Sequence, residues 1–293
     1  MNIDLALRWP SEVGEGPIWD YQSRELIWID VTQGELHRFQ PDSGENITVS
    51  IGKHLGAVGL YSRSHLVAAV RDGFALIEKS SGELTYLNQM LDDGEIRFND
   101  GKCDPVGRFV AGTMRYEPTP NTASLYSCDI RGNVREIIPH VGLSNGLCWN
   151  LSGKVLFYID TLTKEIAQFD YELDSGEIGN RKVIYKFSDN DGSPDGMTID
   201  NLGRLWIAIW GGWRVVCIDQ KGNLIQEVKL PVSQPTSIAF GGEDLCTMFV
   251  TSARFRLSES DLSIEPFAGS VFAIDVGVSG VKEPIFGTGR SGR

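Results

Sequence analysis

The chain has 293 residues, of which 41% are hydrophobic and 10% aromatic, and its formal net charge is −12. This composition supports a packed core and excludes an intrinsically disordered chain. An acidic surface without long runs of one sign repels phosphate groups, so we exclude nucleic acid and anionic membrane as partners and expect a small-molecule ligand. We expect a monomer or a weak homo-oligomer.

Five cysteines, an odd number, are scattered mostly within apolar strand-like runs, and no two form a CxxC pair. This pattern indicates buried free thiols in a reducing compartment. The first ten residues include acids and lack a basic region followed by an apolar core, so no signal peptide is predicted. No window approaches the roughly 20 apolar residues of a membrane helix. We therefore predict a cytoplasmic protein.

Residues 3–8 have strand character, and they precede a template that recurs six times. Each repeat begins with a short apolar strand, and the starts lie near Ile18, Ala57, Lys102, Leu147, Met197 and Ile238. Spacings of about 40–50 residues, with several short strands in each, are typical of propeller blades. The sequence therefore predicts an all-β fold, a six-bladed β-propeller with four-stranded antiparallel blades, as a single domain over residues 1–293.

Within the repeats, apolar and polar residues alternate and the runs end at Gly, Asn or Asp turns. The predicted strands are, in chain order, 26–30, 35–40, 65–70, 74–79, 107–114, 124–130, 154–160, 165–171, 205–216, 247–253 and 270–276. No stretch shows sustained helical periodicity, and the tail 287–293 is expected to be loose. Because an open ring would leave two unpaired edges, we expect residues 3–8 to pair as the outer strand of the last blade.

In four of the six repeats, an acid or an amide precedes a glycine just upstream of the first strand. These residues are Glu15, Asp100, Asn145 and Asp195, and Asn99 lies beside Asp100. Singly, such dipeptides are ordinary turns, because Gly adopts positive φ and Asn or Asp tolerates it. The first strand of each blade lines the central channel, so the common phase predicts that these residues converge at one mouth of the channel.

Convergent carboxylate and amide oxygens are costly to bury unless a cation lies between them. Such ligands favour Ca²⁺, Mg²⁺ or Mn²⁺, and Zn²⁺ or Fe²⁺ is compatible with so few ligands. The equivalent positions in repeats two and six, 55–56 and 236–237, carry no charge and are expected to flank the site. None of the four histidines has this phase, so each is interpreted as a surface or packing residue.

Several motifs occur together in the order RFNDGK (97–102), SNGL (144–147) and PDGM (194–197). With GEGPIWD (14–20), LIWID (26–30) and FYIDT (157–161), they resemble the SMP-30/gluconolactonase/regucalcin family of six-bladed propellers. The chain is similar in particular to bacterial sugar lactonases of pentose oxidation. The resemblance covers nearly the whole sequence.

This resemblance implies one divalent metal ion held by Glu15, Asn145 and Asp195. It implies substrate contacts from Arg97, Asn99 and Glu117. Asp195 is the expected general base, because a ligand carboxylate lies near the attacking water. Asp100 is left open between a direct role in the site and stabilisation of its turn.

The implied activity is metal-dependent hydrolysis of sugar lactones, such as pentonolactones or gluconolactone, to the aldonic acid. The ion would polarise the carbonyl and activate a water molecule. Two alternatives remain open at this point. One is a hydrolase of another ester or a phosphotriester on the same scaffold, and the other is a non-catalytic metal-binding propeller.

Overall fold

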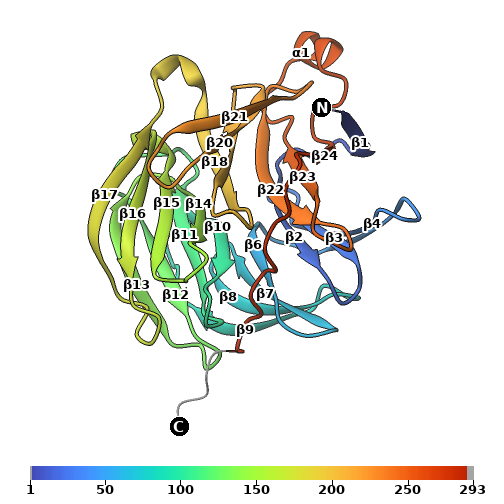
Figure 1. Ribbon diagram of the computed structural model, residues 1–293. Coiled ribbons are helices and arrows are strands. Elements are labelled where there is room, and N and C mark those ends of the chain that lie inside the picture. The colour runs from blue at the N-terminus through green and yellow to red at the C-terminus, as the bar shows by residue number, and fades with distance from the viewer. Residues whose placement is uncertain (1, 289–293) are drawn as a thin grey trace.

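The computed structural model describes residues 2–288 and contains six four-stranded antiparallel sheets arranged as the blades of a propeller (Figure 1). Blades 1 to 3 consist of β2 (Gly14–Asp20), β3 (Glu25–Asp30), β4 (Glu35–Gln40), β5 (Glu45–Ser50); β6 (Leu55–Leu60), β7 (His65–Val70), β8 (Gly73–Glu78), β9 (Leu84–Gln89); and β10 (Ile96–Cys103), β11 (Phe109–Arg115), β12 (Ala123–Cys128), β13 (Val134–Val141). Blades 4 to 6 consist of β14 (Ser144–Trp149), β15 (Val155–Asp160), β16 (Glu165–Tyr171), β17 (Ile178–Lys186); β18 (Ser193–Ile199), β19 (Leu205–Trp210), β20 (Arg214–Ile218), β21 (Leu224–Lys229); and β22 (Pro235–Gly241), β23 (Thr247–Ser252), β24 (Val271–Asp275), β1 (Ile3–Leu7). The predicted fold class is confirmed.

The N-terminal strand closes the ring as expected. Strand β1 pairs antiparallel with β24, with Ile3 opposite Ile274 and Leu5 opposite Phe272. The last blade is therefore built from both ends of the chain, and neither edge of the ring stays open.

The linking segment of blade 6 contains the short helix α1 (Glu259–Ile264), which the sequence did not predict. Ser258 caps its start, because the Ser258 Oγ accepts the backbone N–H of Asp261 and the Asp261 carboxylate accepts the N–H of Ser258. Single 3₁₀ turns occur at Thr161–Thr163 and Asp189–Asp191. No helix within residues 2–288 has the length and apolar character needed to cross a bilayer.

Burial follows the order of strands within a blade. The inner strands β3 and β6 are buried at every residue, whereas the outer strand β5 is mostly exposed. The apolar residues form six clusters, and each cluster lies between two neighbouring blades. All five cysteines are free and four of them are buried, which agrees with the prediction of free thiols.

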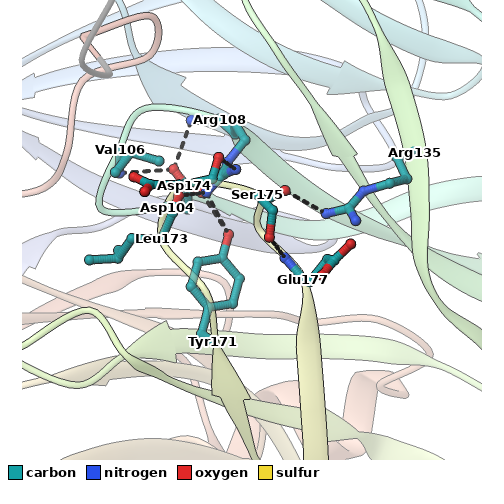
Figure 2. Close-up of polar contacts among 9 residues, drawn as sticks. All are labelled: Asp104, Val106, Arg108, Arg135, Tyr171, Leu173, Asp174, Ser175 and Glu177. Carbon is teal, nitrogen blue, oxygen red and sulfur yellow. Dashed lines mark hydrogen bonds and ion pairs between the residues drawn. The ribbon is translucent and has the colours of Figure 1, made fainter. Parts of the chain in front are cut away.

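A polar clamp joins blades 3 and 4 at their outer turns (Figure 2). Arg108 Nε donates to the buried carboxylate of Asp104 at 2.6 Å, and the Tyr171 hydroxyl donates to the same carboxylate at 2.6 Å. Arg108 also donates to the carbonyls of Leu173 and Asp174, at 2.6 and 3.2 Å. This clamp satisfies a buried charge and fixes the angle between the two blades.

The C-terminal segment 276–288 crosses the other end of the ring and is seen as the dark red trace descending from β24 in Figure 1. Phe286 is buried, and its N–H donates to the carbonyl of Leu60 in blade 2 at 2.7 Å. The N–H of Gly287 donates to the carbonyl of Gly107 in blade 3. Of the tail predicted to be loose, residues 289–293 lie outside the described residues.

Candidate active site

First strands of neighbouring blades contact one another at a common level of the ring. The Asn99 Nδ2 donates to the carbonyl of Ser144 at 2.9 Å, which joins blades 3 and 4. The buried Thr236 hydroxyl donates to the carbonyl of Gly14 at 2.5 Å, which joins blades 6 and 1. Because these contacts fall at the same phase of each blade, the side chains beside them are brought toward one point.

The predicted site residues lie inside the first strands, where the sequence had suggested turns ahead of them. Each first strand loses regular register with its neighbour at this point, as in a β-bulge. The irregular segments are Glu15/Ile18, Phe98/Gly101, Ser144/Leu147 and Pro194/Met197. A bulge bends the strand and re-aims the side chain, which explains how a strand residue points toward the axis.

The glycines that follow these residues are required by close packing more than by backbone conformation. Gly16 has a positive φ of 52°, but Gly146 and Gly196 do not have positive φ. A Cβ on Gly146 would lie 2.5 Å from the carbonyl oxygen of Asp195, and one on Gly196 would lie 2.1 Å from the Ser237 Oγ. The interpretation of Gly146 and Gly196 as positive-φ turn residues is therefore wrong, and neighbouring strands approach too closely for a side chain there.

Glu15, Asp100 and Asp195 form a buried carboxylate cluster, with exposures of 8%, 8% and 6%. Burial raises the pKa of Glu15 well above its usual value, and the charges of Asp195 and Asp100 raise it further. Burial and the charge of Asp100 likewise raise the pKa of Asp195. Burial raises the pKa of Asp100 to about 6, against the opposing effects of Lys102 and the Gly101 N–H. The structure thus places Asp100, which the sequence left open, beside the two predicted ligands.

Asn145 contributes an unsatisfied oxygen to this cluster. Its side chain is 4% exposed, and its Nδ2 donates to the Thr161 hydroxyl at 3.0 Å. Its Oδ1 is buried and has no hydrogen-bond partner among residues 2–288. A hard divalent cation would satisfy this carbonyl oxygen and favour the ionised forms of Glu15 and Asp195, so these three residues fit such an ion.

The fit depends on two carboxylates and one amide. Within the described part of the chain, no group of three or more His, Cys, Asp or Glu side chains is arranged to hold a metal ion. The amide of Asn145 is therefore essential to the proposed ligand set.

Arg97 lies beside the cluster with its guanidinium buried. Its Nη1 donates to the Phe98 carbonyl and to the Asn99 Oδ1, both at 2.9 Å. Burial lowers the pKa of Arg97 to about 10, while Tyr116 and Glu15 raise it. The guanidinium carbon lies 5.9 Å from the centre of the Tyr116 ring. Arg97 and Asn99 are thus coupled to each other next to the carboxylates, in the arrangement that the sequence predicted.

Glu117 lies apart from these residues in the structure. Its side chain is 83% exposed, and its Oε1 lies 3.1 Å from the Arg256 Nη2, on a loop of blade 6. No described contact joins it to Arg97 or Asn99. Its assignment as a substrate ligand stays a prediction.

Two residues near Arg97 were not expected. Tyr116 packs on the guanidinium, and the Tyr116 hydroxyl lies 3.1 Å from the His54 Nδ1. His54 directly precedes Leu55-Gly56, the blade 2 equivalent of the site motif, so its position in the repeat was a usable signal. Trp210 makes an edge contact with Phe255, and no described contact joins it to the cluster.

The family model for the SMP-30/Gluconolactonase/LRE-like region matches residues 13–254. The Bacillus subtilis protein YvrE, which is named for sugar lactone lactonase activity, is 39% identical over 271 residues and covers 92% of both chains. Regucalcin of Gallus gallus is 39% identical over 277 residues, covering 92% of this chain and 93% of its own. The solved structure of regucalcin from Agrobacterium tumefaciens, titled a calcium-binding protein, superimposes with a TM-score of 0.93 at 28% identity and covers 96% of each chain. The protein therefore belongs to the SMP-30/gluconolactonase/LRE-like family.

Proposed function

We propose that this protein is a metal-dependent hydrolase that opens sugar lactones, such as pentonolactones or gluconolactone, to the aldonic acid. The observation that carries the proposal is the unpartnered buried Oδ1 of Asn145 beside the carboxylates of Glu15 and Asp195. The names of the relatives, a sugar lactone lactonase and calcium-binding regucalcins, support a lactone substrate and a divalent ion.

Glu15, Asn145 and Asp195 would hold the ion. When bound, it would polarise the lactone carbonyl and make a water molecule more acidic. Asp195 accepts a proton from the attacking water as oxygen adds to the carbonyl carbon, and returns a proton to the ring oxygen as the ring C–O bond breaks. Atoms then balance, since one water and one lactone give one hydroxy acid.

Arg97 and Asn99 serve as hydrogen-bond donors to the substrate. The fork of the guanidinium suits neighbouring hydroxyl and ring oxygens. The Asn99 Oδ1 receives Arg97, and its Nδ2 is anchored on Ser144, so both side chains are held before substrate arrives. Glu117, at the exposed rim, would accept a hydrogen bond from an outer hydroxyl.

The test measures acid release with a pH-stat on gluconolactone, a pentonolactone and a phosphotriester. Protein stripped with chelator is compared with protein refilled with Ca²⁺, Zn²⁺, Mn²⁺, Mg²⁺ or Fe²⁺. We expect the refilled protein to open at least one sugar lactone well above the buffer rate, and the stripped protein to lose that activity. A faster rate on the phosphotriester would favour the other hydrolase reading.

Two variants separate the roles of the ligands. Asn145→Ala should weaken metal binding measured by calorimetry, and Asp195→Asn should lower both binding and turnover by about 10² or more. Asp42→Asn, which changes an exposed acid on blade 1, is the matched control and should match wild type. Equal turnover in Asp195→Asn and Asp42→Asn would overturn the proposal.

A further inference from the structure

Tyr116 bridges two blades at the mouth of the channel. It follows β11, and its N–H donates to the carbonyl of Glu95 at 3.0 Å, which fixes its backbone on blade 3. Its hydroxyl lies 3.1 Å from the His54 Nδ1, just ahead of β6 in blade 2. The two rings meet edge to face, with centres 5.3 Å apart.

His54 is itself well anchored. Its carbonyl accepts the N–H of Arg71 at 2.8 Å, and the next residue, Leu55, donates its N–H to Val31 of blade 1. Burial and the charges of Arg97 and Arg71 lower the pKa of His54, so the imidazole is neutral near pH 7 and can share a hydrogen bond with the Tyr116 hydroxyl. The tyrosine ring is therefore held from both of its ends.

Arg97 needs such support. Its printed hydrogen bonds leave from Nη1 alone, to the Phe98 carbonyl and the Asn99 Oδ1. A guanidinium held through one nitrogen on a long side chain retains rotational freedom, which costs affinity when a substrate must fix it. The Tyr116 ring, at 5.9 Å, covers the guanidinium and adds a cation–π attraction.

We propose that Tyr116 is a positioning residue for Arg97: its ring, held by His54, fixes the guanidinium in the orientation that binds substrate. This inference rests on the proposed function, in which Arg97 donates to sugar oxygens. Tyr116 and His54 act only through Arg97 and take no part in bond making.

The experiment compares KM and kcat of Tyr116→Leu, Tyr116→Phe and His54→Leu on the sugar lactone that the wild type opens fastest. Tyr116→Leu should raise KM about tenfold with kcat within about twofold, because it removes binding common to the ground and transition states. Tyr116→Phe and His54→Leu keep the ring and should raise KM by about threefold. Tyr185→Leu, which removes another aromatic side chain in an edge contact on the outer strand of blade 4, should leave both constants unchanged.

A double-variant cycle shows whether the effect passes through Arg97. In an Arg97→Ala background, Tyr116→Leu should change KM by less than about twofold. A tenfold change in that background would overturn the proposal, since Tyr116 would then touch substrate by itself. An unchanged KM in the single Tyr116→Leu variant would overturn it as well.

A second readout needs no turnover. The side-chain NMR signals of Arg97 should be resolved and slow to exchange with water in the wild type and in Tyr116→Phe, and should broaden in Tyr116→Leu. If the wild type opens no lactone but these signals behave as expected, the proposed function fails and the positioning role stands. If the signals are the same in all three proteins, the positioning role fails whatever the activity.

Discussion

Gly146→Ala tests whether the site geometry depends on the close approach of β14 and β18. The new Cβ would lie 2.5 Å from the Asp195 carbonyl oxygen and 2.7 Å from the Met197 backbone nitrogen. Ordinary contacts need roughly 3.4 Å or more, so the strand that carries Asp195 must move by about 1 Å. Overpacking of this kind costs about 1–3 kcal/mol of unfolding free energy. Because the displaced atoms are backbone, the Asp195 carboxylate moves with them.

The assay is denaturant unfolding followed by circular dichroism, with calorimetry of Mn²⁺ or Ca²⁺ binding on the same samples. We expect the free energy of unfolding to fall by about 2 kcal/mol and the cation affinity to fall about tenfold or more. Gly179→Ala is the control, since a Cβ there meets nothing within 4 Å and the backbone φ is not positive. That variant should match wild type or gain up to about 1 kcal/mol. If the two variants behave alike, the close-approach argument is refuted.

Three further predictions concern other parts of the ring. Burial lowers the pKa of His37 to about 3, so between pH 6.5 and 3 only the unfolded chain takes up this proton, and unfolding free energy falls as pH falls, by up to roughly 5 kcal/mol; unfolding curves at pH 6 and 5 should show a slope smaller by about 1.4 kcal/mol per pH unit in His37→Phe, and equal slopes would contradict this. Thr161→Val removes the hydroxyl that receives Asn145, so calorimetry should show cation affinity several-fold weaker, at a stability cost of about 1 kcal/mol; unchanged affinity would mean that the amide orients itself. Arg108→Met leaves the buried carboxylate of Asp104 without its cation and should cost about 2–3 kcal/mol in denaturant unfolding, with cation affinity equal to wild type; a loss of affinity would show that the clamp between blades 3 and 4 also shapes the site.

The blade count, the closing strand and the convergence of acids could be predicted because a repeat preserves phase. When the same position recurs in each blade, the topology brings those positions to one level, and no distance is needed to expect it. The pairing of β1 with β24 follows from the same logic, since a ring with an open edge is unfavourable.

Contacts between different blades at irregular positions could not be predicted in this way. Tyr116 follows a strand and His54 precedes one, and nothing in their spacing shows that their side chains meet. The reason for Gly146 was also hidden, because a close approach to the next strand leaves the same sequence signal as a positive φ. Glu117 lies on an exposed loop where side-chain position is set by a partner, Arg256, from a distant blade.

Closure of blade 6 by β1 has a consequence for the order of folding during synthesis. The N-terminal strand emerges first but has no partner until β24, near residue 275, has been made. The early blades must therefore wait on the ribosome with one edge uncovered, where they are exposed to association with other chains. Glu15 also waits, and it meets Asp195 in the finished cluster only when the ring can close, so an ion bound there would preferentially stabilise full-length chains over truncated ones.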